Sequence, residues 1–192
     1  MYTFDVTTDV RKMVTPEFLF GVGVLDYVVH YVRNLGGRKV LLVTDPGVEE
    51  AGWVGRIEGL FRSHHIDYAV FKDISANPRD HEVMAGADFY REQDCDMIVV
   101  LGGGSPIDCA KGIGIVVTNQ CDILEFEGVD EVEVPGPPLI CIPTTAGTSA
   151  DVSQFAVIKN TQKLTKIAIV SKMMVPDVSL IDPFTTTTMD AE

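Results

Sequence analysis

The sequence predicts an α/β domain built on a doubly wound parallel sheet. Short apolar runs alternate with segments whose apolar residues recur at helical spacing. One run, residues 97–101, is apolar at every position, which is typical of a strand buried on both faces under helices. Polar and glycine-rich turns follow several of these runs. In such sheets ligands bind at the carboxyl ends of the strands, so these turns are the first candidates for function.

The elements follow one another in β-α order. We expect strands at residues 39–43, 67–71, 97–101 and 139–142, and helices at 48–64, 80–93 and 106–117. Pro106 suits the first turn of the last helix. Residues 44–47 and Asn77-Pro78 are turn signals, and residues 125–138 are loop-like.

The character of the chain changes after Ser149. Residues 152–158, 166–170 and 178–181 are short strand candidates, and Asn160-Thr161 is a hairpin candidate. We therefore expect one dinucleotide-binding domain over 1–192, with a core at 20–150, a small β-rich extension at 151–183 and the start of a linker helix at 184–192. A helix that begins there has no partner to pack against, so we expect the chain to be a fragment.

Composition excludes several classes of partner. The chain has 192 residues, of which 46% are hydrophobic, and a net charge of −13. So acidic a chain is a poor ligand for nucleic acid and anionic membranes. No apolar run could span a bilayer, and residues 1–14 lack the apolar core of a signal peptide. The four cysteines are far apart in sequence, which favours buried reduced thiols and a cytoplasmic protein.

The glycine turn after the third strand is the main candidate site. Gly102, Gly103 and Gly104 lack Cβ atoms, so their backbone can adopt positive φ and approach an anion closely. The helix beyond presents unpaired N–H groups, and Ser105 can cap it or donate to a phosphate. The run is neither GxGxxG nor a P-loop. The alternative is a helix-capping turn that binds nothing.

Three other groups of residues are ambiguous by themselves. Asp45 could accept both hydroxyls of an adenosine ribose and repel a 2′-phosphate, favouring NAD over NADP, or it could be a plain turn residue. Asp108 could face the cleft or pair with Lys111 on the surface. The hydroxyls in residues 143–149 suit a ribose or phosphate but are also common in turns. The four histidines have no metal-binding spacing, and no Ser-His or Cys-His nucleophile stands out.

Several segments together resemble the iron-containing (group III) alcohol dehydrogenases. They occur in family order and cover most of the chain after about Leu19. The matching pieces are Phe20-Gly21-Val22-Gly23, Val43-Thr44-Asp45, Asn77-Pro78, Gly102 to Asp108 with Ala110-Lys111, Ile142 to Thr148, and Asp177 to Pro183.

The resemblance implies a Rossmann-like, dehydroquinate-synthase-like N-terminal domain that binds NAD in a cleft. By position, Asp45 looks like the adenosine-ribose ligand, and Asn77 lies near the cofactor. Further cofactor roles are implied for a second set: Gly102, Gly103, Gly104 and Ser105 at the pyrophosphate, Thr144, Thr145 and Thr148 at phosphate and nicotinamide ribose, Asp108 near the nicotinamide, and Lys166.

The resemblance also implies what this chain lacks. In the family an all-helical C-terminal domain holds Fe²⁺, or Zn²⁺, with one Asp and three His, the first two in a GxDAxxHxxE segment. Asp190 and the four histidines do not match those positions. We therefore expect no metal site, no catalytic residue and no activity in this chain alone. The run Gly147-Thr148-Ser149-Ala150-Asp151 also departs from the commoner GTGSE.

The full-length protein would oxidise a primary alcohol or diol, or reduce an aldehyde, and could be a homodimer. Two alternatives stay open. One is a relative of glycerol dehydrogenase or dehydroquinate synthase, which share the fold. The other is a stand-alone nucleotide-binding or interaction domain without catalysis.

Overall fold

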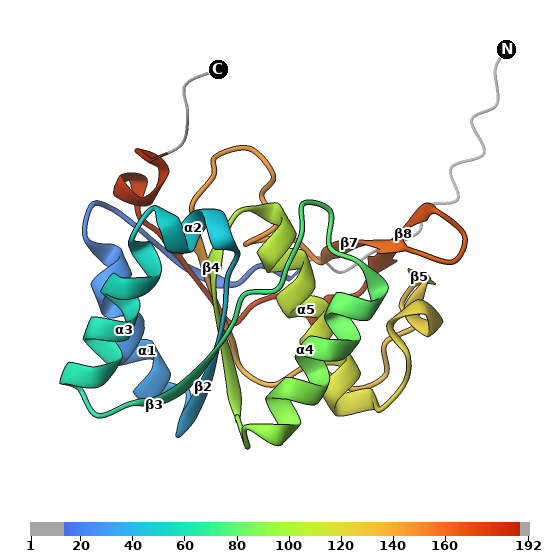
Figure 1. Ribbon diagram of the computed structural model, residues 1–192, viewed down its shortest axis with the longest axis horizontal. Coiled ribbons are helices and arrows are strands. Elements are labelled where there is room, and N and C mark those ends of the chain that lie inside the picture. The colour runs from blue at the N-terminus through green and yellow to red at the C-terminus, as the bar shows by residue number, and fades with distance from the viewer. Residues whose placement is uncertain (1–13, 189–192) are drawn as a thin grey trace, which may run out of the picture.

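The computed structural model describes residues 14–188 and shows a six-stranded parallel sheet between two layers of helices (Figure 1). The strand order is β1-β9-β6-β4-β2-β3, and every neighbouring pair is parallel. The strands are β1 (Glu17–Phe20), β2 (Lys39–Val43), β3 (Asp67–Phe71), β4 (Met97–Gly102), β6 (Leu139–Pro143) and β9 (Val178–Ile181).

The helices cover the two faces of the sheet and create two cores. Helices α1 (Val28–Asn34) and α3 (Trp53–Ser63) lie on one face, and α4 (Asp80–Glu92) and α5 (Gly104–Asn119) on the other (Figure 1). Strand β4 contributes side chains to both cores: Met97 and Val99 belong to one apolar cluster, and Ile98 and Val100 belong to the other. This double burial explains why the strand is apolar at every position.

The predicted fold class is confirmed, and so are the four strands predicted in the first 150 residues. The prediction of one continuous helix over 48–64 is wrong, because the structure has two helices there. Helix α2 (Pro46–Glu50) begins earlier, capped by Asp45, and Gly52 at φ 86° separates it from α3. Helix α5 likewise begins at Gly104 rather than Pro106. Strand β1, the short 3₁₀ helix at Val24–Tyr27 and α1 were not predicted.

The segment after Ser149 divides between two sheets. Strands β7 (Phe155–Asn160) and β8 (Thr165–Val170) form an antiparallel hairpin, which extends through the two-residue β5 (Gly128–Val129) into a second sheet. Strand β9 instead joins the main sheet between β6 and β1. The β-rich stretch is thus not one separate layer. Three further 3₁₀ helices lie at Ile123–Phe126, Lys172–Met174 and Pro183–Thr186.

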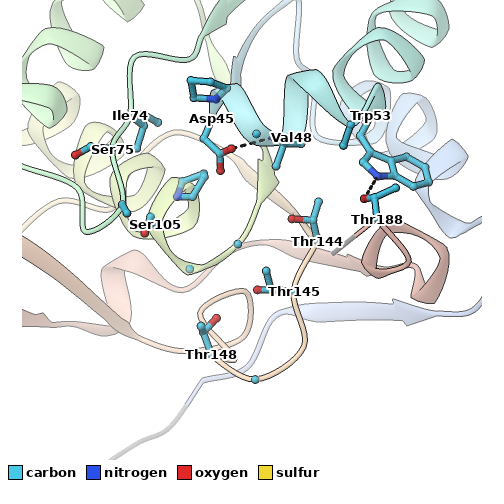
Figure 2. Close-up of a pocket in the computed structure, with 18 of the residues that line it drawn as sticks. Asp45, Val48, Trp53, Ile74, Ser75, Ser105, Thr144, Thr145, Thr148 and Thr188 are labelled. Atoms are coloured by element: carbon cyan, nitrogen blue, oxygen red, sulfur yellow. Dashed lines mark hydrogen bonds between the residues drawn. The ribbon is translucent and has the colours of Figure 1, made fainter. Parts of the chain in front are cut away.

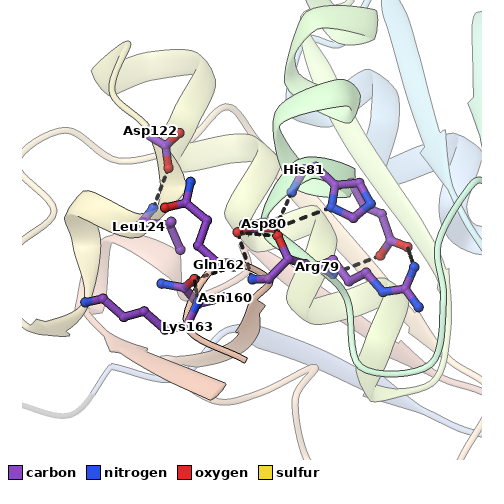
Figure 3. Close-up of polar contacts among 10 residues, drawn as sticks. Arg79, Asp80, His81, Asp122, Leu124, Asn160, Gln162 and Lys163 are labelled. Carbon is purple, nitrogen blue, oxygen red and sulfur yellow. Dashed lines mark hydrogen bonds and ion pairs between the residues drawn. The ribbon is translucent and has the colours of Figure 1, made fainter. Parts of the chain in front are cut away.

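Hydrogen bonds join the turn of the β7–β8 hairpin to the first residue of α4, Asp80 (Figure 3). Asp80, which is 6% exposed, accepts hydrogen bonds from the Thr161 amide at 3.0 Å and the Thr161 hydroxyl at 2.8 Å. Burial alone raises the pKa of Asp80, but bonds from Thr161 and His81 outweigh it and hold that pKa below its usual value. Asn160 accepts from the amides of Gln162 and Lys163 and so closes the turn, as expected at this hairpin.

The described residues contain no helix long and apolar enough to cross a membrane. The four cysteines are free, and Cys95, Cys109 and Cys141 are buried. The prediction that residues 1–14 lack the apolar core of a signal peptide falls on residues that lie almost wholly outside the described part. Residues 189–192 of the expected linker helix, which include Asp190, also lie outside it.

Candidate cofactor-binding cleft

A cleft of about 710 Å³ opens at the carboxyl edge of the main sheet (Figure 2). Its walls come from the ends of β2, β4 and β6, where the sequence predicted polar turns at residues 44–45, 102–105 and 143–149. The volume lies within the usual range for small-molecule sites. The parallel topology brings these three turns together, because all the strands end at one edge.

The glycines at the end of β4 allow close packing rather than an unusual backbone conformation. The expectation of positive φ was wrong: Gly103 has φ −80°, and none of Gly102, Gly103 and Gly104 is among the glycines with positive φ. A Cβ on Gly103 would lie 3.0 Å from Thr145 Cγ2, and one on Gly104 would lie 3.0 Å from Thr148 Cγ2. A Cβ on Gly102 would meet the Pro106 ring at 2.6 Å.

The N-terminus of α5 faces the cleft. Gly104 and Ser105 are its first two residues, so their N–H groups have no acceptor within the helix. The helix has 16 residues, and its dipole adds about half a positive charge at this end. Ser105 does not cap the helix, since its hydroxyl instead accepts from the Asn77 amide at 3.1 Å. An anion at the turn would therefore meet backbone donors and a favourable dipole.

Asp45 combines the two roles that the sequence left open. One carboxylate oxygen accepts from the Val48 amide at 2.9 Å and caps α2, which is the local structural role. The second oxygen has no hydrogen bond to any other described residue, and Asp45 lines the cleft (Figure 2). The capping bond fixes the carboxylate in place while one oxygen stays available for a donor from a ligand.

The loop after β6 forms the wall opposite Asp45. The Thr144 amide donates to Gly102 O at 3.0 Å, which joins this loop to the glycine turn. Thr144 is only 6% exposed, whereas Thr145 and Thr148 stand out beside Gly103 and Gly104. Figure 2 shows Thr145 and Thr148 on the same side of the cleft.

The remaining predicted residues line an adjoining hollow of about 390 Å³, which shares Gly104, Ser105 and Thr148 with the cleft. Here Lys166 donates to Asn77 Oδ1 at 2.5 Å. Asn77 has a left-handed backbone with φ 60°, which Asn tolerates better than most residues. The structure thus brings all the predicted site residues except the buried Gly102 onto the walls of two contiguous spaces.

Asp108 faces this second hollow and does not pair with Lys111. One of its oxygens accepts from the Val157 amide at 3.1 Å, and burial raises its pKa to about 6. Lys111 is 1% exposed and donates to backbone carbonyls of residues 150, 153 and 155. Of the two alternatives for Asp108, the surface pair with Lys111 is therefore wrong: Asp108 lines the hollow beside Val157, and Lys111 turns into the protein toward residues 150–155.

Sequence reasoning missed the apolar end of the cleft. Trp53, Ile74 and Thr188 line it, and the Trp53 indole donates to the Thr188 hydroxyl at 2.9 Å. Trp53 also meets the Phe184 ring edge-on, with centroids 5.4 Å apart. Trp53 and Thr188 lie 135 positions apart in the chain, so only the tertiary fold brings them together.

Residues 14–188 contain no group of three or more His, Cys, Asp or Glu side chains that could hold a metal. These described residues do not fit an iron or zinc centre. His81 is the only histidine within ion-pair distance of a carboxylate in this part of the chain, with Nδ1 3.4 Å from Asp80 Oδ1.

A doubly wound parallel sheet with a helix N-terminus open to a cleft at its carboxyl edge is the arrangement of nucleotide-binding α/β proteins. The comparisons with known proteins name the family. The family model for iron-containing alcohol dehydrogenase matches residues 15–183, and the chain belongs to that family.

The relatives include enzymes from bacteria and yeast. The chain is 40% identical over 166 residues to 1,3-propanediol dehydrogenase of Citrobacter freundii, covering 85% of this chain and 43% of the relative. It is 35% identical over 172 residues to alcohol dehydrogenase 4 of Saccharomyces cerevisiae, covering 90% and 45%. The chain therefore spans less than half the length of these curated relatives.

Solved structures agree with the fold. A 1,3-propanediol oxidoreductase matches with a TM-score of 0.89 at 37% identity, covering 93% of this chain and 47% of that one. A sulfoacetaldehyde reductase from Bifidobacterium kashiwanohense, solved in complex with NAD⁺, matches with a TM-score of 0.84 at 28% identity, covering 94% and 48%.

Proposed function

We propose that this chain is the NAD-binding half of a metal-dependent alcohol dehydrogenase. In the full-length protein, NAD⁺ held in the cleft would supply the hydride acceptor, at the nicotinamide C4, for oxidation of a small primary alcohol or diol, and NADH would supply the hydride donor for reduction of an aldehyde. The observation that carries the proposal is the N-terminus of α5, which opens into the cleft of about 710 Å³ with Gly103 at its N-cap and Gly104 at its first position. Membership of the family supports the same conclusion.

The pyrophosphate would lie at the glycine turn. Its charge would be met by the N–H groups of Gly104 and Ser105 and by the helix dipole. The Thr145 and Thr148 hydroxyls flank the same point, because their side chains pack within 3.4 Å of where Cβ atoms on Gly103 and Gly104 would be. Any side chain at these two positions would push the threonines into the space that a phosphate needs.

Asp45 would hold the adenosine ribose and set the preference for NAD. Its free oxygen would accept from a ribose hydroxyl, and its charge would repel a 2′-phosphate. None of the residues that line the cleft within the described part is Lys or Arg, so a 2′-phosphate would find no cation there.

The nicotinamide end would extend toward the second hollow. There the Lys166–Asn77 hydrogen bond joins β8 to the loop before α4 and restricts that side of the space. Asp108 would lie beside the nicotinamide, with one oxygen held by Val157 and the other free to accept a donor. We expect the metal and the alcohol to be held by the part of the protein that this chain does not span. We also propose that the full-length protein is cytoplasmic and forms a homodimer.

The test is a calorimetric titration of the purified chain with NAD and with NADP. We expect NAD to bind and NADP to bind more weakly. Gly103→Val should abolish NAD binding, because its side chain would displace Thr145. Gly59→Val is the matched control, since Gly59 is exposed on α3 with no atom within 4 Å of an added Cβ. Equal binding of both cofactors by both variants and the parent would refute the proposal.

A further inference from the structure

Lys111 is a charged side chain that the proposed cofactor contacts do not use. It lies in the middle of α5 and is 1% exposed. Its ammonium donates to Ala150 O at 2.5 Å, Ser153 O at 2.7 Å and Phe155 O at 2.9 Å, with Ser153 Oγ at 3.3 Å. Three backbone carbonyls therefore converge on one cation, which has three N–H groups to give.

Burying the Lys111 ammonium lowers the stability of the fold, because the ammonium loses its hydration without gaining a carboxylate partner in the described part of the chain. Among residues 14–188, no carboxylate oxygen lies within ion-pair distance of Lys111. Burial lowers its pKa, and the negative charges of Asp108 and Asp151 only partly oppose that effect. An apolar side chain would fill the same space without the cost of desolvating an ammonium. The three carbonyls, however, would then be left without donors.

The carbonyls belong to an irregular stretch that needs such a donor. Residues 150–154 form turns and a bend between the cleft loop and β7. The stretch begins two residues after Thr148, whose hydroxyl accepts from the Ala150 amide at 3.4 Å and whose methyl group faces Gly104. Lys111 thus joins this stretch to the same helix whose N-terminus carries the glycine turn.

We propose that Lys111 is a positioning residue that fixes residues 148–155 against α5 and so keeps Thr148 in place for the dinucleotide. This role rests on the proposed function of the cleft. Without the clamp, Thr148 and its neighbours would have to be ordered when the ligand binds, and that ordering would weaken binding. The lysine acts through Thr148 and does not touch the cofactor.

The experiment measures NAD affinity by calorimetry for the unaltered chain and four variants (Lys111→Met, Lys163→Met, Thr148→Val and the Lys111→Met, Thr148→Val double variant), at a temperature where each is folded. Lys111→Met keeps the length of the side chain and removes its donors. Lys163→Met is the control, because Lys163 is exposed and its side chain has no hydrogen bond to any described residue. We expect Lys111→Met to weaken NAD binding by about tenfold or more, and Lys163→Met by less than about twofold.

A double-mutant cycle separates positioning from general destabilisation. Thr148→Val removes the hydroxyl but keeps the methyl group beside Gly104. If Lys111 acts through Thr148, Lys111→Met should cost less than about twofold in the Thr148→Val background. An unchanged affinity in Lys111→Met, or its full effect added to that of Thr148→Val, would overturn the proposal. Failure of the unaltered chain to bind NAD would instead refute the proposed function and with it this role.

A second measurement covers the case in which Lys111→Met does not fold. Amide hydrogen exchange of the unaltered chain reports the order of residues 148–155 directly. We expect the amides of Ala150, Val152 and Phe155 to be protected to the same extent with and without NAD. Rapid exchange that slows only when NAD is added would show that the ligand, and not Lys111, orders this stretch.

Discussion

Replacing Asp108 by Asn is expected to stabilise the folded chain at neutral pH. Asp108 is partly buried beside the cofactor cleft, and only one of its oxygens has a partner, the Val157 amide at 3.1 Å. An Asn side chain is almost the same size and can keep that bond through its carbonyl oxygen. The substitution therefore removes a buried negative charge and little else.

The magnitude follows from the pKa of this carboxyl group. Burial raises the pKa from 3.8 to about 6, against the smaller opposing effects of the Val157 amide and Lys111. Because the folded state holds the proton more tightly, the free energy of unfolding decreases as pH rises from about 4 to 6 and is then level. Each pKa unit corresponds to about 1.4 kcal/mol, so the penalty at pH 7 is at most ~3 kcal/mol.

The assay is urea denaturation of the parent chain and Asp108→Asn between pH 4 and pH 8. We expect the variant to be more stable by roughly 1–3 kcal/mol at pH 7 and above, with the advantage lost near pH 4. A difference that does not change with pH, or a variant that is less stable at pH 7, would refute the reasoning.

Three other changes have defined outcomes. NAD should change the fluorescence of Trp53, the single tryptophan, which lines the cleft, and a spectrum unchanged at saturating NAD would contradict this. Gly86→Ala should lower the free energy of unfolding by about 1–3 kcal/mol, since its Cβ would lie 2.4 Å from Ile113 Cδ1. Gly55→Ala, at an exposed position of α3 with no atom within 4 Å of the added Cβ, should not lower it. Thr161→Val removes the hydroxyl hydrogen bonds to Asp80 and should lower the free energy of unfolding by about 1–2 kcal/mol. Thermal denaturation checks this, and an unchanged midpoint temperature would contradict it.

The sequence was most informative where burial dictates residue type. Strand β4 was predictable because both of its faces are covered, which leaves no polar position in the pattern. Its carboxyl end and those of β2 and β6 then placed Asp45, the glycine turn and the threonine loop at one edge, since parallel strands end together. A large part of the candidate cleft follows from that rule alone.

What the sequence did not predict depends on contacts between distant segments. Strand β1 has exposed residues along its length and exists because it pairs with β9, which follows it by about 160 residues. The break at Gly52 depends on a left-handed backbone that an apolar spacing count does not detect. Lys111 looked like a surface residue beside Asp108, because its three carbonyl acceptors lie about 40 residues further along the chain.

The central claim is that the glycine turn binds the pyrophosphate of NAD. The most direct measurement is an NMR titration of the isotope-labelled chain with NAD that follows the backbone amides. We expect the amides of Gly103, Gly104 and Ser105 to shift most, together with those of Thr145 and Thr148. Binding that leaves these amides unchanged while others shift, or no binding at all, would contradict it.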